Sequence, residues 1–131
     1  MPYLAECGGF MYLHEFMEDM KGNTHSMLGI LKDTAYKTSK LARFGYIELK
    51  SNKTSVLGNE DLFCRGHEFH YFDSTSNGTD FVARKPLTNR SWECIHANEN
   101  GVAGFPHMYY YSNPQMIVDF LKNCERTDEG A

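Results

Sequence analysis

The chain has 131 residues, of which 41% are hydrophobic and 14% aromatic, and its formal net charge is −4. This length fits one domain, and the composition excludes an intrinsically disordered chain. The acidic balance, without any run of Lys and Arg longer than two residues, argues against nucleic acid or an anionic membrane surface as a partner. No apolar run reaches the roughly 18 residues that a transmembrane helix needs.

The first predicted elements are a strand, a turn and a helix. Residues 2–6 are predicted to form a short strand that leads directly into a turn at 7–9. Four apolar residues then recur at helical spacing: Phe10, Leu13, Met17 and Met20. This spacing predicts a helix over 10–20, which Gly22 ends.

The rest of the chain is predicted to be mostly β structure followed by one helix. Five runs of β-forming residues, separated by polar turns, predict strands over 27–31, 43–50, 62–72, 80–84 and 91–96. A further predicted strand, 104–111, contains His107. Asn113 caps the predicted helix and Pro114 takes its first position. The apolar face of this helix comprises Met116, Ile117, Phe120, Leu121 and Cys124, and residues 126–131 are predicted to fray.

This order of elements predicts an α/β fold that the chain contains only in part. One βα unit precedes a β-rich middle, whereas a parallel sheet needs flanking strands. We therefore expect an upstream segment or a second chain to supply the missing strands.

The redox state and the cellular location are predicted from the cysteines and the N-terminus. The four cysteines lie far apart, without a Cys-x-x-Cys pair: Cys7, Cys64, Cys94 and Cys124. This spacing is typical of reduced thiols and not of a disulfide framework. Residues 1–7 have neither the basic start nor the apolar core of a secretion signal. We therefore expect a cytoplasmic protein.

The segment 5–9, Ala-Glu-Cys-Gly-Gly, has the small residues that a nucleophile needs on a sharp strand-to-helix turn. At a helix N-terminus, free N–H groups and the positive end of the helix dipole favour the thiolate of Cys7. The N–H of Gly8 is placed to hold an oxyanion, and Gly8 and Gly9 together form the elbow. The alternative, in which Cys7 is a small buried apolar residue at a strand end, is equally compatible with the sequence.

A cysteine nucleophile needs a histidine as its base, and the chain has six histidines. We expect His14 to face solvent from the first helix. His67 and His70 are three residues apart on a predicted strand, which places them on opposite faces and disfavours a metal site with both. We therefore predict no metal site. Spacing alone leaves open whether His107 or His67 is the base.

Several stretches resemble one family. Residues 3–13 are similar to the nucleophile segment of the cobyrinate a,c-diamide synthases, which reads close to YAECGGFMYL. Residues 65–71, Arg-Gly-His-Glu-Phe-His-Tyr, match the RGHEFHY signature of that family. Weaker motifs follow the family order: Met27–Leu31 for M-x-G-x-[LI], Arg43–Tyr46 for R-x-G-Y, Phe105–His107 for the catalytic-histidine strand, and Ser112–Pro114 for the S-N-P helix start.

The resemblance implies a flavodoxin-like class I-type glutamine amidotransferase fold, of which residues 1–131 are a single partial domain, the C-terminal portion. Cys7 would attack the glutamine amide to give a glutamyl thioester and ammonia, with His107 as its base. In the full synthase, an upstream ATP-binding domain or subunit would use ATP and Mg²⁺ to amidate the a and c carboxylates of a corrinoid. This chain is expected to lack that domain and to bind no cofactor itself. Cobyrinate, hydrogenobyrinate and nickel-sirohydrochlorin remain alternatives as the tetrapyrrole.

One departure from related glutaminases concerns the third catalytic residue. Many class I glutaminases have a glutamate two residues after the catalytic histidine, where this chain has Tyr109. Glu68 and His70 are candidates for a supporting role, although a structural hydrogen-bond cluster is the favoured interpretation. The alternative function is an inactive or incomplete fragment or subunit that serves only as an interaction partner of an upstream synthase segment. An unrelated cysteine hydrolase is hard to reconcile with residues 65–71.

Overall fold

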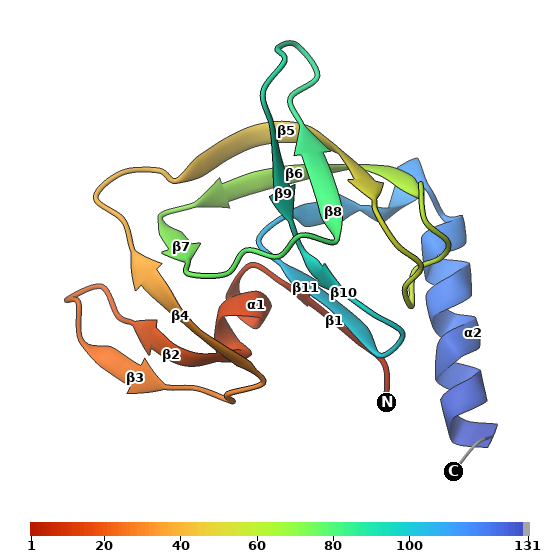
Figure 1. Ribbon diagram of the computed structural model, residues 1–131, viewed down its shortest axis with the longest axis horizontal. Helices are drawn as coiled ribbons and strands as arrows, with labels where there is room; N and C mark the ends of the chain where they lie inside the picture. The colour runs from red at the N-terminus through yellow and green to blue at the C-terminus, as the bar shows by residue number, and fades with distance from the viewer. Residues whose placement is uncertain (130–131) are drawn as a thin grey trace.

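The computed structural model describes residues 1–129, which form three sheets, two α-helices and one 3₁₀ helix. The sheet nearest the N-terminus has the order β1-β11-β10 (Figure 1). β1 (Tyr3–Glu6) pairs in parallel with β11 (Gly101–Gly104), and β10 (His96–Ala97) pairs with β11 in antiparallel. Within the described residues β1 pairs only with β11. The predicted first strand is thus confirmed, and the supply of further strands from elsewhere stays a prediction.

The helix predicted over 10–20 is wrong. α1 (Gly8–Tyr12) ends after five residues and is followed by β2 (His14–Glu18). β2 lies between β3 (Thr24–Ser26) and β4 (Leu31–Lys37), in a sheet of order β3-β2-β4-β7. A short isolated helix is only marginally stable in water, so pairing with two neighbouring strands outweighs the helical spacing of the apolar residues.

The strand predicted over 27–31 is also displaced. The N–H groups of Met27, Leu28 and Gly29 bond back to carbonyl groups of residues 12–15, so this stretch closes a turn. Gly29 has φ 73°, a conformation that favours glycine. The strand β4 begins only at Leu31 and is followed in its sheet by β7 (Phe72–Ser74).

The central sheet is antiparallel throughout, with the order β12-β6-β5-β8-β9. Its strands are β12 (His107–Tyr109), β6 (Phe63–His70), β5 (Arg43–Ser51), β8 (Phe81–Arg84) and β9 (Ser91–Cys94). The four strands predicted over 43–50, 62–72, 80–84 and 91–96 are thereby confirmed in their main parts. The predicted strand 104–111 is interrupted, because β11 ends at Gly104 and β12 begins at His107 in another sheet.

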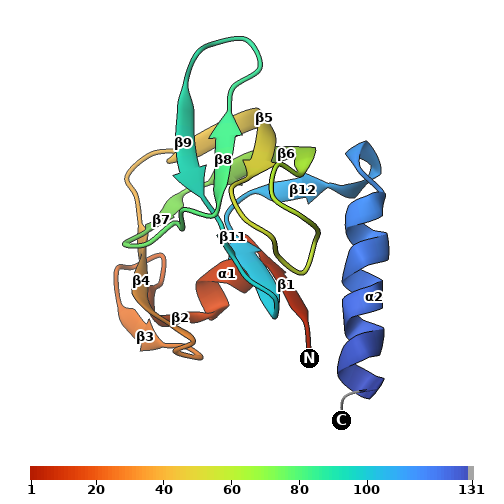
Figure 2. The same ribbon diagram turned by 45° about the vertical axis from the view of Figure 1, so that its right-hand side comes forward.

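The C-terminal part is a 3₁₀ helix, η1 (Tyr110–Ser112), followed by α2 (Gln115–Glu129). α2 lies at the opposite end of the molecule from β2, β3 and β4 in both views (Figures 1 and 2). Met116 is buried in the core, whereas Leu121 of the predicted apolar face is exposed. Fraying was predicted from Arg126, but the helix continues to Glu129, and residues 130–131 lie outside the described part.

Two apolar clusters hold these elements together, and the smaller one lies beneath the turn at Cys7. Its buried members are Phe10, Met11, Leu13, Ala35, Ala103 and Phe105. Phe10 comes three residues after Cys7, and Phe105 comes two residues before His107. One cluster therefore supports both segments that the sequence predicts to be catalytic. The molecule is a mixed α/β structure, as predicted.

The larger cluster contains two buried thiols whose titration affects stability. Burial raises the pKa of Cys64 to about 12 and raises that of Cys94 further. The unfolded chain releases these protons from about pH 8.5 upward, whereas the folded chain retains them. The free energy of unfolding should therefore fall by about 1.4 kcal/mol per pH unit for each thiol above that pH.

Urea unfolding of the reduced protein between pH 7 and 10.5 measures this loss. The matched control is the double variant Cys64→Ala, Cys94→Ala, whose stability is lower throughout but should decline less steeply above pH 8.5. An equal slope in both proteins would contradict the prediction.

Candidate active site

Cys7 lies on a strained turn between β1 and α1. Its φ of 52° and ψ of −106° are rare for a residue other than glycine. Two backbone hydrogen bonds hold the turn: the Cys7 N–H donates to the Gly104 carbonyl at 2.9 Å, and the Met11 N–H donates to the Cys7 carbonyl at 3.0 Å. The predicted succession of strand, turn and helix around Cys7 is confirmed, and its role as a nucleophile elbow stays a prediction.

The two glycines after Cys7 leave room around the turn. A Cβ at Gly9 would contact the side chain of Ala5 at 3.6 Å, and a Cβ at Gly8 would meet nothing within 4 Å. Gly8 is exposed, so its side of the turn is accessible to a small molecule. The open side of the turn is thus at Gly8.

The Cys7 thiol is half-buried, and burial is the main reason that its pKa lies above the ordinary value. The backbone N–H of Gly8 bonds to the thiol and lowers the pKa, whereas the nearby carboxylates of Glu6 and Glu68 raise it. The net shift is upward, so the thiol form predominates at neutral pH. The expectation that the helix N-terminus favours the thiolate is therefore wrong, because burial outweighs it. A nucleophilic role for Cys7 therefore requires a base.

The pairing of β1 with β11 brings the Cys7 turn close to the segment of His107. Glu6 is in register with Gly104, so Cys7 and Phe105 leave adjacent parallel strands at the same end. Ligand sites commonly form at the carboxyl ends of parallel strands. His107 comes two residues after Phe105, at the start of β12. Cys7 and the segment that leads to His107, which are far apart in the sequence, thus leave the ends of neighbouring strands.

His107 is exposed and lies in a row of three rings that crosses the central sheet. It is paired with His67 of β6, and their ring centroids are 6.4 Å apart. Tyr46 of β5 lies on the other side of His67, at a centroid distance of 5.7 Å. These rings line a groove of about 610 Å³, together with residues that include Arg65, Pro86 and Tyr109. The groove gives His107 an accessible surface.

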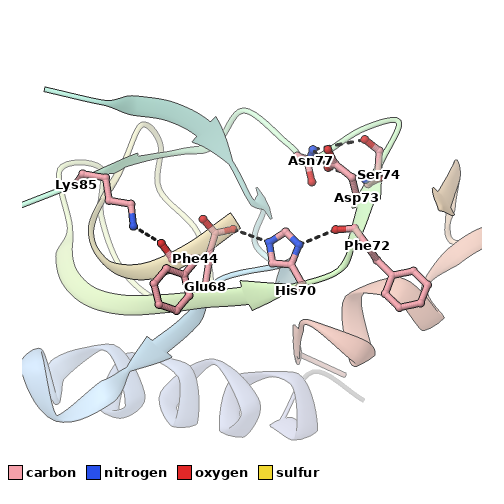
Figure 3. A network of polar contacts seen from close by, with 8 residues as sticks. All are labelled: Phe44, Glu68, His70, Phe72, Asp73, Ser74, Asn77 and Lys85. Carbon is pink, nitrogen blue, oxygen red and sulfur yellow. Dashed lines mark hydrogen bonds and ion pairs between the residues drawn. The ribbon is translucent and has the colours of Figure 1, made fainter. Parts of the chain in front are cut away.

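Glu68 and His70 lie on the inner face of β6, away from this groove. Their side chains are almost fully buried, and His70 Nε2 is 3.2 Å from Glu68 Oε1 (Figure 3). His70 Nδ1–H donates to the Phe72 carbonyl at 2.6 Å, because a carbonyl can only accept. Glu68 Oε2 has no hydrogen-bond partner among residues 1–129. The opposite orientation of His67 and His70 is as predicted.

The buried pair is connected to the candidate catalytic segments by packing. The His70 ring stacks on Phe105 at a centroid distance of 4.0 Å and an angle of 10°. Phe105 contacts Phe10 edge-on at 5.0 Å. These contacts fit the interpretation of Glu68 and His70 as a structural cluster. The charge of Glu68 also contributes to the raised pKa of Cys7. A supporting catalytic role stays a prediction.

His14 was expected to face solvent, and this expectation is wrong. Its ring is fully buried, with Nδ1 at 2.9 Å from the Phe10 carbonyl and Nε2 at 2.7 Å from Ser74 Oγ. Burial lowers the pKa of His14, so the neutral ring is favoured. His14 therefore braces the end of α1 and is not available as a base.

The sequence interpretation missed one residue, Glu6. Its carboxylate accepts hydrogen bonds from the Met108 N–H and the Tyr110 hydroxyl, both in or next to β12. The only signal in the sequence was a charged residue at the end of an otherwise apolar strand. That signal does not reveal the partner, because β12 is distant in sequence and comes beside Glu6 only in the folded chain.

Two further findings concern the described residues as a whole. Within residues 1–129, no three His, Cys, Asp or Glu side chains lie together in a way that could hold a metal ion. Neither described α-helix is long and apolar enough to cross a membrane.

Comparison with known proteins identifies relatives. Residues 1–114 match the CobB/CobQ-like glutamine amidotransferase domain. The chain is 36% identical over 126 residues to the cobyrinate a,c-diamide synthase of Caldanaerobacter subterraneus subsp. tengcongensis, covering 95% of this chain and 28% of that protein. It is 38% identical over 120 residues to the enzyme of the same name from Fusobacterium nucleatum, covering 88% and 26%. The Leptospira interrogans enzyme is 32% identical over 131 residues, covering 96% and 29%.

The chain thus spans between a quarter and a third of the length of these relatives. The similarity includes both the strained Cys7 turn and the strand of His107, since the matched domain covers residues 1–114. On this evidence the chain belongs to the CobB/CobQ-like glutamine amidotransferase family.

Proposed function

We propose that this chain is the glutaminase part of an ATP-dependent cobyrinate, or related tetrapyrrole, a,c-diamide synthase. The observation that carries the proposal is the Cys7 turn, with its positive φ, beside the parallel strand that leads to His107. Family membership supports glutamine as the substrate. The relatives are cobyrinate a,c-diamide synthases, which supports cobyrinate as the acceptor in the complete enzyme.

The proposed reaction begins with proton transfer from the Cys7 sulfur to His107. The thiolate attacks the side-chain amide carbon of glutamine, and the carbonyl oxygen becomes an oxyanion that the Gly8 N–H stabilises. The tetrahedral intermediate collapses when His107 returns the proton to the departing nitrogen. Ammonia leaves, and a glutamyl thioester on Cys7 remains. Water then hydrolyses this thioester to glutamate and restores the thiol.

The other steps of the synthase are assigned to a part of the enzyme outside this chain. ATP and Mg²⁺ would activate the carboxylates of the corrinoid in an ATP-binding domain or subunit, which would receive the ammonia. The proposed reaction at Cys7 needs no cofactor. The unpaired outer edge of β1 within residues 1–129 favours a second candidate function, an inactive fragment that only binds such a partner.

The test uses 6-diazo-5-oxo-norleucine, a glutamine analogue that alkylates amidotransferase nucleophiles. The purified 131-residue chain is treated with this diazoketone and the adduct is mapped by peptide mass spectrometry. We expect one adduct, on Cys7, which excess glutamine prevents and which is absent in Cys7→Ala. The other three cysteines serve as internal controls.

One outcome would contradict the proposed glutaminase function. If iodoacetamide modifies Cys7 but the diazoketone does not, the thiol is accessible without a glutamine site. The glutaminase assignment of this chain would then be wrong, and the second candidate function would replace it.

A further inference from the structure

The His107 ring has no hydrogen-bond partner among residues 1–129, and the ring next to it is that of His67. A catalytic base is normally held in place by a third group. Tyr109, two residues after His107, points away from the core and is exposed. The position of the His107 ring relative to Cys7 therefore depends on whatever holds the backbone of β12.

β12 is an edge strand of the central sheet, and Glu6 binds its free side. Glu6 Oε2 accepts the Met108 N–H at 2.5 Å, and Oε1 accepts the Tyr110 hydroxyl at 3.1 Å. Hydrogen bonds to a carboxylate are stronger than those between neutral groups, and the bond from Met108 is the shorter of the two. Both carboxylate oxygens are thus used on the segment that immediately follows His107.

The same side chain is also attached directly to the nucleophile, because Glu6 precedes Cys7 in the chain. Glu6 lies at the last position of β1, where its backbone is in register with Gly104. One carboxylate therefore joins the peptide before Cys7 to the peptide after His107. The connection crosses from the β1-β11-β10 sheet to the central sheet.

We propose that Glu6 is a positioning residue for the glutaminase reaction, which holds β12 and the His107 ring at a fixed place relative to Cys7. This inference rests on the function proposed above for Cys7 and His107. Glu6 acts from the nucleophile strand and through the backbone of Met108, and not by a hydrogen bond to the His107 ring.

The charge of Glu6 also affects the reactivity of Cys7, in the opposite direction from its hydrogen bonds. After burial, which is the larger cause, the Glu6 carboxylate contributes to the raised pKa of Cys7. Removing this charge should make Cys7 more reactive towards a simple alkylating reagent. Removing the hydrogen bonds should make Cys7 less reactive towards a glutamine analogue, because that reaction needs His107 in place. A merely structural role predicts no such divergence.

The test is Glu6→Gln, which keeps the shape of the side chain but replaces one acceptor oxygen by an NH₂ donor. Two rate constants are measured by mass spectrometry at pH 7.5: modification of Cys7 by 6-diazo-5-oxo-norleucine and by iodoacetamide. We expect the first to fall at least about 10-fold, since a misplacement near 1 Å can cost about 100-fold. We expect the second to rise, with the midpoint of its pH profile moved downward.

Two further variants serve as comparisons. Tyr110→Phe removes only the hydroxyl donor and leaves the bond from Met108, so its diazoketone rate should lie between those of wild type and Glu6→Gln. Glu93→Gln removes an exposed carboxylate on β9, and both rates should stay at the wild-type values. Hydrogen exchange of the Met108 amide should be faster in Glu6→Gln than in wild type.

The outcomes separate this inference from the proposed function. If the diazoketone labels the wild type and its rate is unchanged in Glu6→Gln, the role of Glu6 is overturned. The glutaminase proposal then still stands. A parallel fall of both rates in Glu6→Gln also overturns it, because the turn itself is then damaged. Absence of diazoketone labelling in wild type overturns the proposed function, and the role of Glu6 fails with it.

Discussion

Replacement of His107 by alanine is expected to lower the rate constant for modification of Cys7 by 6-diazo-5-oxo-norleucine by about 10²–10⁴-fold. The physical reason is the raised pKa of the Cys7 thiol, which leaves little thiolate at neutral pH unless a base removes the proton. The rate is measured by intact mass spectrometry at pH 7.5. The loss should shrink as the pH rises, because hydroxide then forms the thiolate without His107.

The sequence alone leaves His67 as a second candidate for the base, and a matched pair of variants decides between them. His67→Ala should have a much smaller effect than His107→Ala, although the two rings are neighbours in the groove. His25→Ala, which removes an exposed ring paired with Asp19, should leave the rate unchanged. A larger loss in His67→Ala than in His107→Ala would assign the base to His67.

The replacement Phe10→Ala should lower the free energy of unfolding by about 3–5 kcal/mol, the range for a fully buried phenylalanine. The Phe10 side chain is 0% exposed and its ring contacts His14 at 4.6 Å and Phe105 at 5.0 Å between centroids. Deleting the ring would leave a cavity between α1 and the segment before His107. Urea denaturation, followed by Trp92 fluorescence and far-ultraviolet circular dichroism, measures the effect.

Phe44→Ala is the matched control, because Phe44 is 62% exposed on the outer face of β5. Removing the Phe44 ring should lower the free energy of unfolding by at most about 1 kcal/mol, the scale of a single cross-strand aromatic contact. Equal costs for the two variants would show that the cluster around Phe10 does not stabilise the fold as described. A Phe10→Ala protein that unfolds at lower urea should also react more slowly with the diazoketone, since Cys7 and Phe10 share one turn.

The strands that the sequence predicted well are those of the central sheet. In β5 and β6, inward and outward residues alternate, so Ile47 and Leu49 are buried while Tyr46 and Lys50 are exposed. This alternation is local, has a period of two residues and can be recognised from the sequence. The turn at Cys7 was predicted for a similar reason, because small residues on both sides of a nucleophile are a local requirement.

The prediction failed where distant partners decide the local structure. The apolar residues of 10–20 have helical spacing, yet residues 14–18 form a strand because β3 and β4 offer hydrogen bonds on both sides. His14, expected on a helix surface, is consequently buried against Ser74. Neither β3 nor β4 lies within residues 10–20, whose spacing predicted the helix.

The sequence by itself determined the strand, turn and helix around Cys7, the main strands of the central sheet, and the resemblance that points to glutamine. Each depends on neighbouring residues or on a motif within one segment. Only the tertiary structure decided that Glu6 binds the backbone beside His107 and that Glu68 and His70 are buried behind Phe105. Those contacts join strands far apart in the chain, so the energies that favour them arise only when the sheets have packed together.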